Sequence, residues 1–168
     1  YGSNGTDLLT SAVTTASDGT FTITGDYTCP SASTPVVLVA EGGDPGIGSD
    51  NSAIDLAAAL GSFGNLTSRI YIVVNDVPSA AVAVALGQFA TISGGHFGVR
   101  PSATNITGLL NASNTATSLV NFSTGLATVS TSLAGAGGTI TATPESDKLS
   151  TIANILAACV NSTGSGSA

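Results

Sequence analysis

The chain has 168 residues, of which 42% are hydrophobic and only 8% are charged. An average soluble domain is about 25% charged, so this surface consists mainly of hydroxyl, amide, backbone and methyl groups. The net charge of −7, with three Lys and Arg in all, argues against nucleic acid and anionic membranes as partners, because both require clustered basic side chains.

The first quarter of the chain predicts β structure. A strand is expected over Leu8 to Thr15, and Ser17 to Thr20 supplies a turn in which Gly19 permits a positive φ. Phe21 to Thr24 alternates apolar and polar residues, as a half-buried strand does. Val36 to Ala40 is a short β-branched run that predicts a fully buried strand.

The pattern changes after Glu41 to Asp50, a loop dense in Gly, Pro and Asp. Asn51 to Leu60 predicts a short helix that ends near Gly61. Arg69 to Asp76 (RIYIVVND) predicts a strand. Ala80 to Ala90 is apolar on nearly all sides and predicts a buried helix.

The C-terminal part is mainly helical. A helix is outlined from Ile106 to Val120, and residues 123–143 predict loop or weak strand. The last helix is expected to begin with Thr143 as its cap and Pro144 in its first turn, and to run to Val160. Strands followed by helices, without regular alternation, predict an α+β fold.

The run from Val13 to Gly25 resembles the strand–turn–strand of carboxypeptidase-regulatory-like, immunoglobulin-like modules. The whole chain is similar to a group of secreted bacterial proteins of unknown function, in which such a sandwich precedes an Ala-rich helical region. The other similar segments are Tyr27 to Pro30, Gly61 to Leu66 and Leu156 to Ser162. That group often has a Cys where this chain has Phe63, so its disulfide pattern need not transfer.

The resemblance implies an immunoglobulin-like β-sandwich packed with a helical segment, and it brings no activity. We expect a β-sandwich portion at residues 1–45 and a mixed, mainly helical portion at residues 46–168, packed as one unit. Modules of this kind have a further strand before the segment that matches Leu8 to Thr15, and the sequence does not contain it. A neighbouring chain can fill such an edge by strand addition; the alternative is that this strand was removed or is not essential.

Two cysteines, Cys29 and Cys159, allow a single pairing. In an exported chain the expected state is a disulfide between them. The alternative is two buried free thiols, which behave as small apolar side chains.

Signals for catalysis and metal binding are weak. His96 is the only histidine, and the sequence contains no nucleophile motif with which it could form a catalytic site. We therefore expect His96 to be a polar loop residue. Oxygen ligands in or beside the Gly-rich loop form a weak candidate calcium site. Its residues are Glu41, Asp44, Asp50 and Asp55. We expect no cofactor.

Six of the ten asparagines stand in an Asn-x-Ser/Thr pattern, which marks candidate glycosylation sites. They are Asn4, Asn65, Asn105, Asn111, Asn121 and Asn161. The alternative is a polar surface without sugar.

Taken together, these features predict a non-enzymatic, secreted structural subunit that assembles with copies of itself into an extracellular or cell-surface filament. Strand addition or broad low-charge contacts would carry the assembly, since Lys and Glu are depleted where proteins touch each other. The longest wholly apolar run, Ala80 to Leu86, is far shorter than the ~20 residues of a membrane span. Two alternatives remain: a monomeric adhesion or carbohydrate-binding module, and a secreted hydrolase that uses acids of the 41–55 region.

Overall fold

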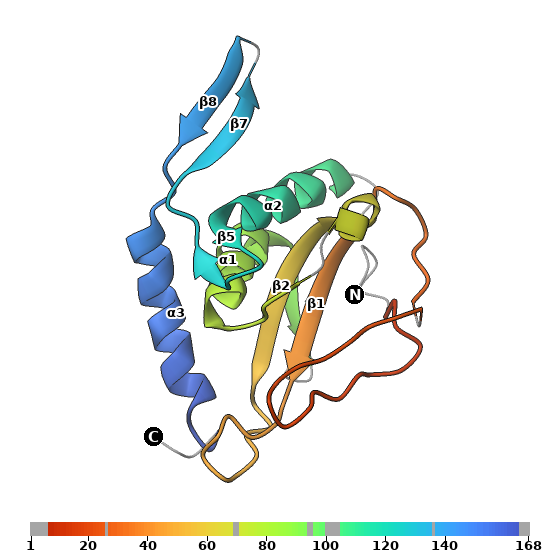
Figure 1. The fold of residues 1–168 in the computed structure, drawn as a ribbon, viewed down its shortest axis with the longest axis vertical. Helices are drawn as coiled ribbons and strands as arrows, with labels where there is room; N and C mark the ends of the chain where they lie inside the picture. Colours follow the sequence, from red (N-terminus) through yellow and green to blue (C-terminus); the bar gives the residue numbers. More distant parts are fainter. Residues whose placement is uncertain are drawn as a thin grey trace.

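The computed structural model describes residues 7–25, 27–68, 71–93, 96–99, 105–135 and 137–164. Three helices and four two-stranded antiparallel sheets form this part of the chain (Figure 1). The helices are α1 (Asp76–Leu86), α2 (Ile106–Leu119) and α3 (Ser146–Val160). The strands are β1 (Pro35–Glu41), β2 (Asp55–Ser62), β3 (Ala90–Ser93), β4 (His96–Val99), β5 (Val120–Asn121), β6 (Leu126–Ala127), β7 (Thr131–Gly135) and β8 (Gly138–Ala142). Short 3-10 helices follow β2 and α1, at η1 (Phe63–Ser68) and η2 (Gly87–Phe89). The predicted α+β class is confirmed, and the described strands pair only two by two, without closing a sandwich.

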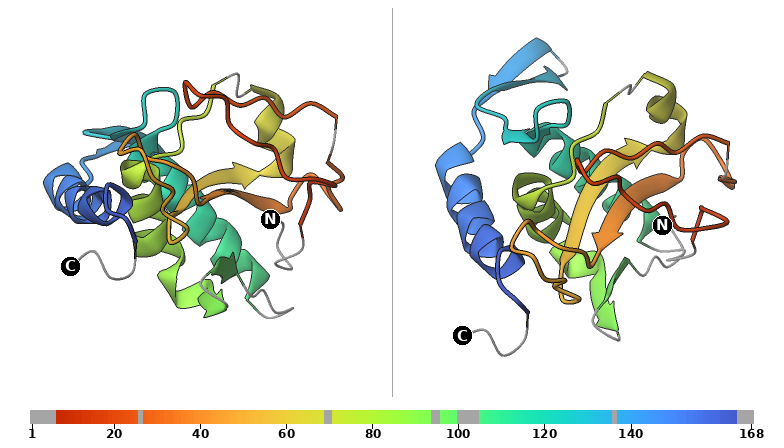
Figure 2. Two further views of the ribbon diagram at one scale, coloured as in Figure 1. Left: turned by 90° about the horizontal axis from the view of Figure 1, so that it is seen from below. Right: turned by 60° about the horizontal axis from the view of Figure 1, so that its bottom comes forward.

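The β1–β2 hairpin is the central layer of the molecule. Glu41 pairs with Asp55 at one end and Pro35 with Ser62 at the other, with a register shift between Val36 and Val37. Figure 2 (left) shows this sheet between the helices on one side and the N-terminal segment on the other. Both faces of the hairpin are therefore covered.

Helices α1 and α2 cover one face of this sheet. Because side chains alternate along a strand, Ala57 and Ala59 of β2 share this face and lie in the same cluster as Val82 of α1 and Leu109 of α2. The small alanine side chains let the helices approach the strand closely. The buried members of the cluster are Val37, Ala57, Ala59, Val82, Leu86, Leu109, Ala112 and Ala116.

Irregular chain covers the opposite face. Ala58 and Leu60 of β2 pack there with Val36 and Phe122, and Leu8 from the N-terminal segment lies against this cluster. The segment of residues 7–25 crosses the sheet on this side (Figures 1 and 2).

Helix α1 is the most enclosed helix because it contacts the sheet, α2 and α3 together. Its residues Ala80 and Ala81 pack against Leu149 and Ala153 of α3 in a further cluster. The predicted burial is confirmed for Ala80 to Val82 and Leu86, whereas Ala83 and Val84 are exposed. The helix ends at Leu86 rather than Ala90, which begins β3. No helix in the described ranges is long and apolar enough to cross a membrane.

The helix predicted over Asn51 to Leu60 is wrong, because this segment contributes β2. Alanine favours helices in isolation. Here, however, the β-branched run of β1 offers a hydrogen-bonding ladder, which the bond from Gly42 N–H to Ile54 O (2.9 Å) extends. Burial on both faces then outweighs the local propensity.

The strand predicted over Arg69 to Asp76 is also wrong for residues 71–75, which form no ladder; residues 69 and 70 lie outside the described ranges. Ile72 and Val74 do pack against the core. The alternation of apolar residues in this segment therefore results from burial of these side chains and not from strand pairing. Val73 N–H donates to Phe122 O at 2.9 Å.

The two strands predicted at the N-terminus are wrong as well. Leu8 to Thr15 and Phe21 to Thr24 are irregular, and a single bridge joins Leu9 to Tyr27. The turn between them is confirmed: Asp18 Oδ1 accepts from Thr20 N–H at 3.0 Å and from Thr20 Oγ1 at 2.7 Å. Backbone bonds from Ala16 N–H to Thr20 O (2.8 Å) and from Gly19 N–H to Ala16 O (2.9 Å) close the turn, and the Asp18 side chain stabilises it without flanking strands.

The helices predicted at the C-terminal end are confirmed as α2 and α3. Helix α3 begins at Ser146, with Glu145 rather than Thr143 at the N-cap position. Residues 123–143, predicted as loop or weak strand, contain β6, β7 and β8.

Candidate functional site

Strands β7 and β8 form a hairpin that projects from the body of the molecule (Figure 1). A two-residue connection joins Gly135 to Gly138, and the register places Leu133 opposite Ile140. Among the residues of β7 and β8 whose side chains the structure describes, none belongs to a core cluster. The hairpin is therefore a two-stranded ribbon whose described side chains lie outside the core.

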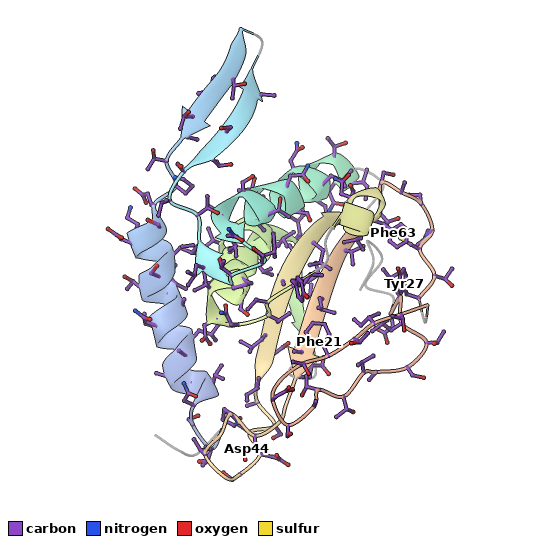
Figure 3. The ribbon with its side chains drawn as sticks, viewed as in Figure 1. Phe21, Tyr27, Asp44 and Phe63 are labelled. Carbon is purple, nitrogen blue, oxygen red and sulfur yellow. The ribbon has the colours of Figure 1, made fainter. Side chains whose placement is uncertain are left out.

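The hairpin belongs to a long stretch without charge. No Asp, Glu, Lys, Arg or His occurs from residue 101 to residue 144, a range that includes α2 and β5 to β8. The Gly-rich loop that carries Asp44 lies at the opposite end of the molecule from the hairpin (Figure 3). The hairpin itself thus carries no charge, and the charged residues that follow it in the chain are Glu145, Asp147 and Lys148 at the start of α3.

Large apolar side chains are exposed in and just before this hairpin. Leu126 is 61% exposed, Val129 is 69% exposed and Ile140 is 62% exposed. Isolated exposed apolar residues are ordinary on protein surfaces. Three within one uncharged segment make this region the foremost candidate for a contact surface in the described chain.

The predicted disulfide is not formed. Cys29 and Cys159 are both free thiols; Cys29 is half-buried, with its Sγ donating to Ser31 O at 3.4 Å, and Cys159 is exposed in the last turn of α3. Neither thiol is buried, so the alternative of two buried thiols does not describe them either.

The acids of the weak calcium candidate do not converge. Asp44 organises its own loop: its Oδ1 accepts N–H bonds from Gly46 and Ile47 (2.9 Å each) and from Gly48 (3.1 Å). Glu41 and Asp55 are cross-strand partners at the end of the β1–β2 hairpin, and Asp50 is exposed. Across the described residues, no three His, Cys, Asp or Glu side chains gather as a metal site.

His96 begins β4 rather than lying in a loop, and it pairs with Ser93 of β3. An aromatic contact joins Tyr27 and Phe63, whose ring centroids are 5.8 Å apart in an edge-to-face arrangement (Figure 3). This pair lies beside the β1–β2 sheet, where Phe63 packs against the core cluster. Its role is therefore packing.

Among the described residues, Asp18 and Asp76 have pKa values that are shifted in opposite directions. Burial raises the pKa of Asp76, which lies in the first turn of α1 and whose Oδ1 is buried without a hydrogen-bond partner among the described atoms. The hydroxyl of Thr20, and then its backbone N–H, lower the pKa of the exposed Asp18.

Most of the predicted glycosylation sites lie at the surface. Asn4 lies outside the described residues, Asn105 at the N-cap of α2 is half-buried, and the other four are exposed: Asn65, Asn111, Asn121 and Asn161. Ser113 is the third residue of the Asn-x-Ser pattern at Asn111. It is only 1% exposed, and its hydroxyl is buried. Modification at Asn111 would therefore have to precede folding of α2.

The projecting hairpin is the feature that the sequence analysis missed. Its signal in the sequence is the set of glycines at 135, 137 and 138, which separates Thr131 to Ala134 from Thr139 to Ala142, because glycine favours tight turns. The low hydropathy contrast of Ser, Thr, Ala and Gly concealed the alternating pattern of the two strands.

A scan against protein-family models, a search of curated proteins and a search of solved structures each found no match for this chain.

Proposed function

We propose that this chain is a non-enzymatic, secreted structural subunit that assembles with copies of itself into an extracellular or cell-surface filament. The observation that carries the proposal is the β7–β8 hairpin, which projects from the body and contains no charged residue and no proline. A two-stranded hairpin alone is marginally stable in water. Exposed strand edges are usually protected by charges, prolines or covering chain, and a neighbouring subunit would provide that cover.

The charge distribution also supports self-assembly. Copies that each carry a net charge of −7 repel one another where their acids approach, over a screening distance of about 8 Å at physiological salt. The uncharged stretch of residues 101–144 provides a surface on which two copies can meet without this repulsion. Contacts made there would depend little on ionic strength.

The enzymatic alternative rests on acids of the 41–55 region. Of these, Asp44 already accepts three backbone N–H bonds from its own loop, which favours a structural role for this carboxylate. The structural proposal is therefore preferred over the hydrolase.

Membership of the secreted bacterial group, and the immunoglobulin-like sandwich that it implies, are part of the same proposal. Supporting it, residues 7–25 run across the face of the β1–β2 sheet that is opposite the helices, where the second layer of a sandwich would lie (Figure 2). Glycans on the exposed asparagines would add a polar coat. Intact mass of native material tests the glycans directly.

The experiment for self-assembly is sedimentation velocity of the 168-residue chain over a hundredfold range of concentration, followed by negative-stain microscopy. We expect oligomers that grow with concentration and persist in 0.5 M NaCl. A single monomeric species at every concentration would overturn the proposal.

A further inference from the structure

We infer that two copies of this chain join edge to edge through strand β8, antiparallel across a twofold axis that passes beside Ile140. The inference rests on the proposed self-assembly and specifies the surface that makes the first contact. Two hairpins then form one four-stranded sheet in the order β7, β8, β8, β7.

The free edge of β8 is defined by the register of the hairpin. Gly135 and Gly138 close a two-residue connection, and in such a hairpin the closing pair exchanges hydrogen bonds. Alternation then directs the N–H and C=O groups of Ile140 toward β7 and those of Thr139 and Thr141 outward. No other described residue bonds to these outward groups.

The outward edge of β8 is complementary to itself. Its sequence Thr139-Ile140-Thr141 reads the same in both directions. A twofold axis beside Ile140 sets Thr139 opposite Thr141 of the second copy, and Thr141 opposite its Thr139. Both pairs carry outward backbone groups, so each exchanges two N–H···O=C bonds, which makes four bonds across the axis.

The side chains agree with this register. Ile140 meets Ile140 of the second copy in a non-hydrogen-bonded pair, the position where facing side chains come closest. On the other face, threonine lies opposite threonine, a favourable cross-strand pair. The 62% exposure of Ile140 decreases on pairing.

The occupant is a second copy rather than a different partner because the edge matches itself and carries no charge to attract a basic or acidic chain. The edge is that of β8 rather than β7 for two reasons. The outward residues of β7 are Ser132 and Ala134, which have lower strand propensity than threonine. Strand β8 also lies on the side of the hairpin away from α2 (Figure 1).

The test uses proline at an outward position. Thr141→Pro removes an N–H that points away from β7, so the hairpin itself keeps its bonds, as prolines on edge strands do. The loss of two of the four intermolecular bonds should weaken dimerisation at least about tenfold. Ser132→Pro, at an outward position of β7, is the matched control and should assemble as the unmodified chain does. Circular dichroism establishes that both variants fold.

A crosslink tests the axis independently of folding effects. In a Cys29→Ser, Cys159→Ser background, Ile140→Cys should form an intermolecular disulfide with oxidised glutathione as the oxidant, because facing Cβ atoms at a non-hydrogen-bonded pair are ~4.5–5.5 Å apart. Thr139→Cys, which faces Thr141 rather than itself, should crosslink far less.

The outcomes separate the inference from the proposed function. Weak assembly of Thr141→Pro with normal assembly of Ser132→Pro, together with the Ile140→Cys crosslink, supports pairing through β8. Assembly that both prolines leave intact, or that both abolish, overturns the twofold β8 contact while self-assembly stands. A monomeric unmodified chain overturns both.

Discussion

The side-chain amide of Asn51 caps helix α3 from 108 residues away in sequence: its Nδ2 donates to the backbone oxygens of Cys159 and Val160, each at 3.2 Å. Asn51 is 2% exposed, and its Oδ1 accepts from Ala53 N–H at 2.9 Å. The last carbonyls of a helix have no partner within the helix. This one residue therefore joins the loop before β2 to the end of the C-terminal helix.

Replacement of this cap should destabilise the fold. Asn51→Ala removes the side-chain bonds to the Val160 carbonyl and the Ala53 N–H, whereas Cys159 O keeps its bonds from Ser162 N–H (3.2 Å) and Ser162 Oγ (2.6 Å). We expect a loss of about 1–2 kcal/mol in the free energy of unfolding. Asn51→Asp should cost more at neutral pH, because a carboxylate cannot donate and is repelled by the negative end of the helix dipole. Urea unfolding measures both, with the exposed Asn154→Ala on α3 as the control that should change stability by less than about 0.5 kcal/mol. Equal stability of Asn51→Ala and Asn154→Ala would contradict the capping role.

Ser79 joins the sheet to helix α1. Its Oγ accepts from Ala57 N–H at 2.9 Å on the edge of β2 away from β1, and the hydroxyl lies 2.7 Å from Asn75 O, to which it donates. Ser79→Ala should cost about 1–3 kcal/mol because it leaves the buried Ala57 N–H unsatisfied. Thr151→Ala on α3, which removes an exposed bond to Asp147 O, is the control and should be near neutral. Thermal unfolding measures the stability of both variants. Unchanged stability of Ser79→Ala would contradict the role of this bond and would mean that the Ala57 N–H finds another acceptor.

Gly125 is required by both its backbone and its surroundings. Its φ is +68°, and a Cβ at this position would lie 2.5 Å from Val73 Cγ1 and 2.7 Å from Asn75 Nδ2. Gly125→Ala should therefore destabilise by about 2–4 kcal/mol, through strain and through displacement of the Asn75 side chain that caps α1. Gly19→Ala has a similar φ of +78° but open space around it, and should cost about 1 kcal/mol. Similar losses for the two variants would mean that steric overlap at Gly125 is relieved by movement of Val73.

The two shifted acids predict opposite pH effects. Burial raises the pKa of Asp76, so the folded state binds its proton more tightly, and Asp76 costs stability as pH rises from 3.8 through the raised value. Asp76→Asn should therefore gain stability relative to the unmodified chain over this rise. The Thr20 bonds lower the pKa of Asp18, so its contribution is present above 3.8 and is lost as pH falls through the lowered value. Unfolding curves of Asp76→Asn and Asp18→Asn between pH 2.5 and 7 measure these slopes; slopes of the same sign for the two variants would contradict the assignment.

The two thiols should react separately. Because Cys159 is exposed and Cys29 is half-buried with its Sγ bonded to Ser31 O, iodoacetamide should label Cys159 first and Cys29 more slowly under native conditions. Intact mass before and after labelling counts the modified thiols, with urea-unfolded protein as the reference for complete labelling. Absence of labelling without a reductant, and full labelling with one, would establish the disulfide predicted from the sequence instead.

Elements with a strong local signal could be predicted from the sequence. Helices α2 and α3 follow from their apolar spacing, and α1 follows from the run Ala80 to Leu86; the loop around Asp44 and the turn at Asp18 follow from Gly, Pro and Asp. Strand β1 follows from the β-branched run Val36 to Val39. In each of these segments, short-range sterics and side-chain bonding favour one backbone conformation.

The tertiary structure decided the elements whose local preference is weak or is opposed by packing. Asp55 to Leu60 is rich in alanine yet pairs as β2, because β1 supplies its ladder and both of its faces are buried. Ile72 and Val74 have the alternating spacing of a strand, but their side chains pack against the core and the segment joins no sheet. The candidate assembly hairpin follows the same rule: Thr131 to Ala142 has too little hydropathy contrast to reveal its period, and the pairing of Leu133 with Ile140 becomes visible only in the folded chain. The sequence by itself determined a nearly uncharged surface. The tertiary structure decided that the charge-free stretch ends in an exposed strand edge. Composition can be read from the sequence, whereas long-range pairing and burial depend on which segments the fold brings together.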